Sequence, residues 1–233
     1  MNTKICGITR LEDAEAAIAA GAWAIGLNHS PSSGRMIDPE TAERIGAAVR
    51  RRVEVAGVFV NATLDQVVGH AEREHLTLLQ LHGEEGPSFC MEAARRTGCR
   101  VIKAFRVRSS ADVTASRAYR TDFHLFDAHS RRAHGGTGES FDWDLVQRRR
   151  GGVPTIVAGG LDPDNVAAAI DATWPWGVDV ASGVESAVGI KDHNKIVSFI
   201  EAANRAGAAQ MATREHRREL KKVRREVERR TSA

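Results

Sequence analysis

The sequence predicts an α/β protein built as a closed barrel of eight parallel strands, each followed by a helix. Short apolar, β-rich runs alternate with amphipathic stretches as far as residue 203. A strand followed by a helix and a further strand normally makes a right-handed crossover, so the strands are expected to be parallel. Eight such units within about 200 residues favour closure over an open doubly wound sheet, which usually has fewer strands. We therefore predict a single-domain (β/α)8 barrel, the TIM-barrel fold.

The elements follow one another without a break in the pattern. The expected strands are 3–6, 23–27, 53–60, 77–81, 100–105, 123–127, 153–158 and 178–181. The expected helices are 12–20, 39–49, 64–74, 87–97, 111–119, 143–149, 163–170 and 191–203.

Several of these helices carry start signals. Asp38 and Asp162 each precede a proline, which pairs an acidic N-cap with proline at the first helical position. Thr9 is expected to cap the first helix, and Asn61 or Thr63 the third.

The bulk composition is that of a soluble globular protein, with 42% hydrophobic and 27% charged residues. No apolar run approaches the roughly 18 residues that a membrane span needs. The N-terminus lacks a basic segment followed by an apolar one, so no secretory signal is expected. We predict a cytoplasmic protein without membrane association.

Charge is distributed unevenly along the chain. Residues 205–233 contain 10 Lys or Arg and 4 Asp or Glu, which gives this tail +6 and leaves −3 for residues 1–204. The predicted organisation is a barrel domain at 1–204 and a basic tail at 205–233.

A nucleic-acid footprint on the acidic body is not expected. The tail is either a solvated helical or disordered extension, or a short coiled-coil or partner-binding helix with a narrow apolar seam.

The cysteines indicate single-thiol chemistry if any. Cys6, Cys90 and Cys99 cannot form a complete disulfide framework, and none has the spacing of a metal knuckle or a redox pair. Cys6 ends the first strand and is followed by Gly7. An inert core thiol is one interpretation. In a barrel, however, sites lie on the loops after the strands, so a thiol there faces the barrel mouth.

A carboxylate ends the sixth strand at Asp127. A carboxyl group in an apolar barrel mouth can keep its proton near neutral pH and act as an acid. The thiolate of Cys6 would be the matching base, and Lys4 or helix N-termini would need to favour its ionisation. Together they suffice for a proton-transfer isomerisation without a metal or an organic cofactor.

Glycine-rich loops follow the last two strands. Gly159 and Gly160 follow the seventh strand, and Ser182 and Gly183 follow the eighth. These are the loops that commonly bind phosphate in this fold, because glycine lets backbone N–H groups approach an anion. The expected ligand is a sugar phosphate or a similar anion.

Three further loops border the same end of the barrel. Arg35, in the loop 30–36, is either a solvent-facing arginine or a fork for a substrate carboxylate. His82 either binds substrate or caps its loop. The long loop 128–140 contains Gly135-Gly136-Thr137-Gly138 and is a candidate lid.

Motifs in this order resemble the phosphoribosylanthranilate isomerase family of tryptophan biosynthesis. The match covers about residues 3–203 and rests on Lys4-Ile5-Cys6-Gly7-Ile8-Thr9, Gln80-Leu81-His82-Gly83, Phe126-Asp127, Gly135-Gly136-Thr137-Gly138, Phe141-Asp142-Trp143, Ala158-Gly159-Gly160-Leu161, Asp179-Val180-Ala181-Ser182-Gly183-Val184-Glu185 and Gly189-Ile190-Lys191-Asp192.

The resemblance implies an Amadori rearrangement of N-(5-phosphoribosyl)anthranilate, a small phosphosugar substrate, with no cofactor. It makes Cys6 the general base and Asp127 the general acid. Arg35 would contact the anthranilate carboxylate and Asp179 the reacting sugar. Gly159, Gly160, Ser182 and Gly183 would hold the phosphate. The expected assembly is a monomer or homodimer.

One segment departs from the family pattern. Where an aromatic-rich stretch is usual, this chain reads Leu27-Asn28-His29-Ser30-Pro31-Ser32-Ser33-Gly34-Arg35, which predicts a more polar wall beside the anthranilate ring. His29 and Gly34 therefore motivate an alternative, a paralogous isomerase for another phosphosugar-amine. A non-catalytic barrel that binds a partner through its basic tail is the other alternative.

Overall fold

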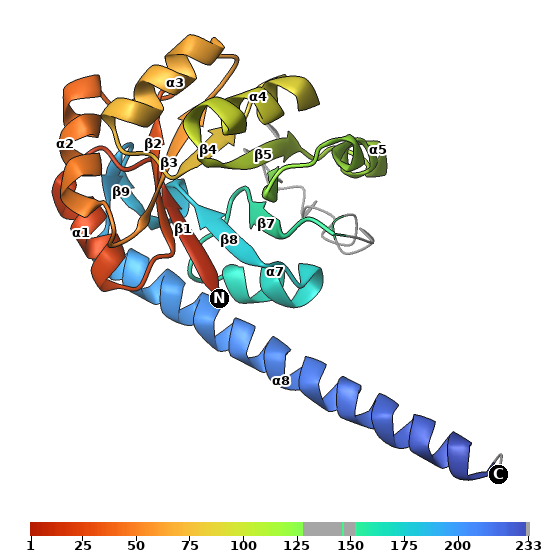
Figure 1. Ribbon diagram of the computed structural model, residues 1–233. Coiled ribbons are helices and arrows are strands. Elements are labelled where there is room, and N and C mark those ends of the chain that lie inside the picture. The colour runs from red at the N-terminus through yellow and green to blue at the C-terminus, as the bar shows by residue number, and fades with distance from the viewer. Residues whose placement is uncertain (128–145, 147–151, 232–233) are drawn as a thin grey trace.

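The computed structural model describes residues 1–127, 146 and 152–231, and in the last helix it describes side chains as far as residue 213. Eight strands close into a barrel in chain order, with β1 hydrogen-bonded to both β2 and β8. All neighbouring pairs are parallel. Helices cover the outside (Figure 1). The predicted (β/α)8 barrel is confirmed.

The element bounds lie close to the predicted ones. The barrel strands are β1 (Asn2–Cys6), β2 (Ala24–Asn28), β3 (Glu54–Phe59), β4 (Leu78–Leu81), β5 (Arg100–Arg106), β6 (Phe123–Asp127), β7 (Thr155–Ala158) and β8 (Gly177–Val180). The helices are α1 (Leu11–Ala19), α2 (Pro39–Val49), α3 (Leu64–Arg73), α4 (Pro87–Thr97), α5 (Ser110–Ala115), α7 (Val166–Thr173) and α8 (His193–Thr231). Two 3-10 turns, η1 (Ser116–Ala118) and η2 (Ser182–Val184), complete them.

Three segments need separate mention. A small antiparallel hairpin of β9 (Glu185–Ala187) and β10 (Ile190–Lys191) lies between β8 and α8, and the sequence pattern did not predict it. The helix predicted at 143–149 lies outside the described residues, apart from the buried Val146. The candidate lid at 128–140 lies outside them as well.

Strand alternation divides the side chains between two cores. Residues that face outward from the strands, such as Ile5, Ile25 and Val157, are buried beneath the helices. Residues that face inward near the strand starts fill the barrel interior, and they pack with Trp23 and Trp176. These inward residues include Ala24, Ala56, Leu78, Ile102, Phe123, Leu125 and Ile156. The strand starts are therefore filled mainly by apolar side chains.

The helix caps were predicted with mixed success. Asp38 accepts a hydrogen bond from the Thr41 N–H at 3.0 Å, as expected. Of the two residues proposed for α3, Thr63 is the cap, in a reciprocal capping box with Gln66.

Two other cap predictions are wrong. The hydroxyl of Thr9 donates to the carbonyl of Gly189 at 2.5 Å, so it ties the β9–β10 hairpin to the barrel and does not cap α1. The carboxylate of Asp162 accepts the N–H groups of Asp164 and Asn165 within a turn, and α7 begins only at Val166.

The last helix of the barrel continues into the basic tail. Ile196, Phe199, Ile200 and Ala203 are buried at helical spacing, which packs the first part of α8 against the barrel. The side chain of Gln210 still donates to a carbonyl of α7. Beyond this point α8 leaves the barrel surface (Figure 1). The tail backbone is thus helical, one of the two states predicted.

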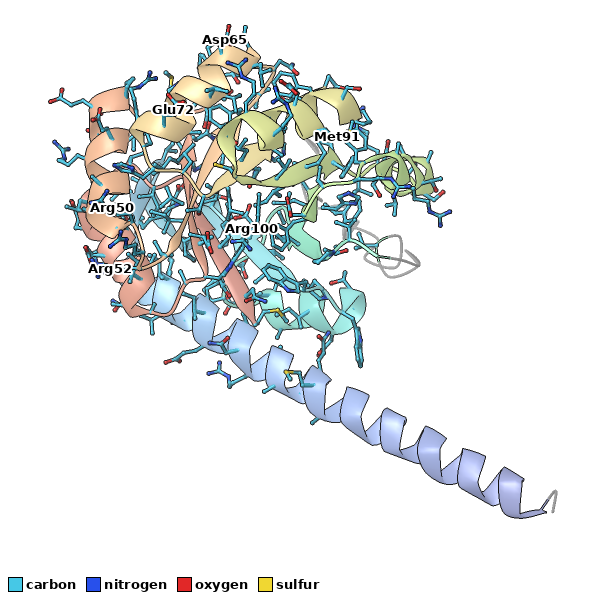
Figure 2. All side chains as sticks on the ribbon, viewed as in Figure 1. Arg50, Arg52, Asp65, Glu72, Met91 and Arg100 are labelled. Atoms are coloured by element: carbon cyan, nitrogen blue, oxygen red, sulfur yellow. The ribbon has the colours of Figure 1, made fainter. Side chains whose placement is uncertain are left out.

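Charged side chains cover the outer faces of the helices, as Figure 2 shows for Asp65 and Glu72 on α3 and Arg50 and Arg52 after α2. In the described part of the chain, we find no helix with the length and apolar character that crossing a membrane requires.

Candidate active site

A pocket of about 230 Å³ opens at the carboxyl ends of the barrel strands. The predicted site residues that line it are Cys6, Arg35, His82, Asp127, Gly159, Gly160, Asp179 and Ser182. The lining does not include Gly183. A Cβ at that position would overlap the carbonyl of Leu161, so this glycine lets the loops after β7 and β8 pack together.

Cys6 shares its end of the pocket with an ion pair. The register of β1 and β8 sets Lys4 opposite Asp179, and both side chains face the barrel interior. Lys4 Nζ lies 2.9 Å from Asp179 Oδ1, with the lysine fully buried. Gly26 on β2 makes room for this group, because a Cβ there would lie 2.8 Å from the sulfur of Cys6 and 3.1 Å from Lys4 Nζ.

The surroundings of Cys6 favour its neutral thiol. Burial raises the pKa of Cys6, because it removes water that would solvate the thiolate. The ammonium of Lys4 lowers this pKa, and the carboxylate of Asp179 raises it again. Burial alone would lower the pKa of Lys4, but the pairing with Asp179 and Cys6 raises it. Lys4 therefore stays charged, and its ammonium group interacts with both the carboxylate of Asp179 and the thiol of Cys6.

This arrangement predicts opposite pKa shifts from two neighbouring substitutions. Lys4→Met removes the cation and is expected to raise the pKa of Cys6 further, whereas Asp179→Asn is expected to lower it. The pH dependence of Cys6 alkylation by iodoacetamide, followed by peptide mass spectrometry, measures both. Curves that move in the same direction in the two variants would contradict the assigned electrostatics.

The acid candidate lies across the pocket from β1, at the end of β6. His82 Nε2 lies 3.4 Å from Asp127 Oδ2, and Gln80 Nε2 lies 3.1 Å from His82 Nδ1. Because an amide nitrogen only donates, Gln80 in this orientation leaves the imidazole proton on Nε2, facing Asp127. The side chain of Asp127 is about one-fifth exposed, so water or a ligand reaches it from the pocket.

Arg35 is held in a two-bond pairing. Its Nε and Nη2 donate to the two carboxylate oxygens of Glu185, each at 2.7 Å. Buried Lys191 donates to the same carboxylate at 2.9 Å and to the carbonyl of Ala181. Burial opposes ionisation of Glu185, but the two cations hold the pKa of this carboxyl below its usual value. The arrangement fixes the guanidinium plane, and within the described residues Nη1 has no hydrogen-bond partner.

The opposite side of the pocket is formed by backbone. Gly159 and Gly160 have φ of 98° and 64°, a region that side-chain-bearing residues rarely adopt. Asn165 fixes this loop, because its side-chain amide donates to the Gly160 carbonyl at 2.9 Å. The turn η2 begins at Ser182, which lines the pocket together with these two glycines. Such loops can present N–H groups to an anion.

The structure corrects the interpretation of one residue. His29 was expected in the wall beside an aromatic substrate group. Asn28 takes the pocket-facing position, so its neighbour His29 points to the opposite side of the sheet, where it stacks on Phe59. Its side chain is 5% exposed and lies against α3. Within the described residues, Asn28 and Arg35 are the members of segment 27–35 that line the pocket.

Sequence reasoning missed the residues that hold Arg35. Glu185 and Lys191 are charged residues at buried positions, but they occur in a short segment without clear periodicity. Two signals were available: both residues belong to motifs of the family resemblance, and both lie between the eighth strand and the last helix.

A second cavity, about 350 Å³, lies beside the pocket and is lined by β5 and α5. It includes Lys103, Phe105, Arg106 and Tyr119, and shares His82 with the first. It contains neither Cys6 nor Asp127. The chemistry is therefore assigned to the smaller pocket.

Comparison with known families agrees with this geometry. A family model described as N-(5'phosphoribosyl)anthranilate (PRA) isomerase matches residues 3–202. The chain belongs to the phosphoribosylanthranilate isomerase family. The resemblance inferred from the sequence motifs is confirmed.

Individual family members match along almost their whole length. The N-(5'-phosphoribosyl)anthranilate isomerase of Citrifermentans bemidjiense is 48% identical over 202 residues, which cover 87% of this chain and 96% of the relative. That of Geobacter metallireducens is 45% identical over 203 residues, covering 87% and 98%.

Solved structures of the family share the barrel. The phosphoribosyl anthranilate isomerase from Thermotoga maritima superposes with a TM-score of 0.78 at 39% identity, covering 88% of this chain and 98% of that one. A phosphoribosyl anthranilate isomerase in complex with reduced 1-(o-carboxyphenylamino)-1-deoxyribulose 5-phosphate superposes with a TM-score of 0.75 at 38% identity, again covering 88% of this chain and 98% of that one.

Proposed function

We propose that this protein is a phosphoribosylanthranilate isomerase of tryptophan biosynthesis. It converts N-(5-phosphoribosyl)anthranilate to 1-(2-carboxyphenylamino)-1-deoxyribulose 5-phosphate. The observation that carries the proposal is the meeting of Cys6 and Asp127 at one pocket in a chain of this family. The reaction is an internal redox isomerisation of the sugar, so it requires only proton transfers.

Asp127 opens the ring in the first step. Its carboxyl group gives a proton to the furanose oxygen, the C1′–O bond breaks, and the nitrogen lone pair forms a C1′=N iminium. The electron pair of the broken bond stays on the oxygen, which becomes a hydroxyl. The acid must lie near the ring oxygen, and Asp127 extends from the end of β6 into the pocket.

Cys6 acts in the second step. Its thiolate removes the proton from C2′, and that electron pair forms a C1′=C2′ bond while the iminium electrons return to nitrogen. The resulting enol then loses its hydroxyl proton and gains one at C1′ to give the ketone. Lys4 supports this base because its charge favours the thiolate in a buried site.

The two ends of the substrate have charges that match the pocket. Its phosphate fits the backbone loops at Gly159–Gly160 and Ser182, and its carboxylate fits the Nη1 edge of Arg35. Binding both ends sets the sugar between Cys6 and Asp127. Holding reactant and catalytic groups in this way supplies a large share of the rate.

The pairing of Arg35 leads to a prediction about affinity. Glu185→Gln keeps the side-chain shape but removes the charge that orients the guanidinium. It is expected to raise KM by about tenfold, the cost of roughly one charge-assisted hydrogen bond, with a smaller effect on kcat. Steady-state kinetics with generated substrate measures both parameters. A lower kcat at unchanged KM would indicate that the pairing serves chemistry instead of binding.

Complementation tests the whole proposal. A tryptophan auxotroph that lacks this isomerase should grow without tryptophan when it expresses the chain. The matched control is Cys6→Ser, which should not restore growth at equal soluble expression. Failure of the unaltered chain, when soluble and well expressed, would refute the proposed function. Purified protein should also consume N-(5-phosphoribosyl)anthranilate, which is followed by loss of its fluorescence.

A further inference from the structure

Three metal-binding side chains meet outside the barrel interior, on the side of the sheet away from the pocket. They are His29, which follows β2, and His70 and Glu74 from the end of α3. We propose that this cluster is a binding site for a divalent transition-metal ion with the ligand preferences of zinc. The proposal is independent of the isomerase reaction, because none of the three lines the pocket.

Helix geometry directs two of the ligands to one place. His70 and Glu74 are four residues apart, so they share the inward face of α3 with Val67 and Ala71. Figure 2 shows Glu72, between them in sequence, at the outer surface.

The strand supplies the third ligand, and packing fixes its ring. Stacking on Phe59, with centroids 5.1 Å apart, and against His70 at 4.1 Å holds the imidazole of His29 over α3. The end of α3 is fixed in turn, because the carbonyl of Glu74 lies against Gly46 of α2 where any Cβ would overlap it.

The donor atoms lie at near-coordination spacing. His70 Nδ1 is 2.6 Å from Glu74 Oε1, His29 Nε2 is 2.9 Å from Glu74 Oε2, and all three ligand atoms fall within 4.8 Å of one another. A tetrahedral zinc with bonds of about 2.0–2.1 Å holds its ligands roughly 3.4 Å apart. Small side-chain rotations therefore admit an ion, and the backbone need not move.

Two of these atoms face each other and have no further partner within the described residues. His29 Nε2 and Glu74 Oε2 are buried and make no hydrogen bond of acceptable geometry within the described residues, although they face each other. Their side chains are 5% and 1% exposed. Buried polar atoms whose only contact has poor hydrogen-bond geometry are uncommon, and a shared cation would give both atoms a full partner.

The chemistry of the donors selects the ion. Two imidazoles and one carboxylate suit zinc and its neighbours in the transition series, whereas magnesium and calcium prefer oxygen alone. These three protein ligands leave the fourth coordination position of a tetrahedral ion for water. The side chain of His70 is 19% exposed, so the ion and its water reach the site from solvent along that ring. The C-terminal end of α3 adds a negative helix dipole, which favours a cation.

Zinc binding at this position would link β2 to α3 and stabilise the fold. The experiment uses metal-free, full-length protein that carries Cys6→Ser, so that the pocket thiol does not compete for the ion. Zinc is titrated against a chromophoric chelator, and the Tm is recorded with and without zinc. Cobalt is a second probe, because its visible absorption distinguishes four-coordinate from six-coordinate sites.

We expect one equivalent of zinc, an increase in Tm on binding, and four-coordinate cobalt spectra. His29→Phe, which keeps the stacking, and His70→Gln should each weaken the affinity for zinc by more than about 100-fold. Loss of a direct ligand costs more than loss of a residue that only hydrogen-bonds to a ligand. Glu72→Gln, on the exposed face of the same helix, should leave the affinity unchanged. Absence of a zinc-dependent Tm change, or equal affinity in His29→Phe and the parent, would overturn the site.

Discussion

Replacing Cys6 with serine is expected to lower kcat by about 10³-fold and to leave the barrel folded. The two side chains have nearly the same shape, and a hydroxyl is a far weaker acid than a thiol, so Cys6→Ser keeps the geometry and removes the base. General bases typically contribute about 10²–10⁴ in rate, which sets the expected range. Initial rates at saturating substrate measure kcat. The circular dichroism spectrum and the Tm, compared with those of the parent, verify the fold.

The other cysteines provide the control for this experiment. Cys90 is a buried residue of α4, and burial raises its pKa to about 11, so it is inert at neutral pH. Cys90→Ala should keep kcat near the parent value while lowering stability by a few kcal/mol at most. Near-normal turnover in Cys6→Ser would remove Cys6 from the role of base.

Replacing Asp127 with asparagine is expected to be comparably severe, with a loss in kcat of about 10²–10⁴-fold. Asparagine fills the same space and can still face His82, but it has no proton to give to the ring oxygen. Substrate should still bind, because the groups assigned to the phosphate and the carboxylate are untouched. KM is therefore expected to change little, which kinetics and direct binding of a product analogue both test.

His82 gives the matched comparison for the acid. His82→Gln removes the imidazole beside Asp127 but keeps a polar side chain, and its loss in kcat should be much smaller than that of Asp127→Asn. If the two variants lost activity equally, the proton donor would be the pair and not the carboxyl group alone. Full activity in Asp127→Asn would exclude it as the acid.

The strand pattern predicted that Cys6 and Asp127 would lie at the same face of the barrel, and both line the pocket. Cys6 and Asp127 each end a run of alternating or apolar residues, and parallel strands in a barrel all end on the same face. That rule needs only the strand ends and no knowledge of packing. The same alternation could have placed His29 correctly, because a residue next to an inward-facing Asn28 must face the helices.

Other features depend on contacts that periodicity does not encode. The pairing of Arg35 with Glu185 spans 150 residues and needs the β9–β10 hairpin, whose strands are too short to leave a pattern. Thr9 has the composition of a cap, but the same hairpin offers its hydroxyl a carbonyl from the other end of the chain. In both cases the choice is made by distant segments that meet only in the folded barrel.

The ion pair of Lys4 and Asp179 has a consequence for the order of folding. Its partners are 175 residues apart and lie on the two strands that close the barrel. During synthesis Cys6 and Lys4 emerge first, but the lysine has no counter-charge until β8 emerges near the end. Contacts of such long sequence separation form late, because the loop they close is large. Return of catalysis during refolding should therefore lag behind helix formation and report when the first and last strands join.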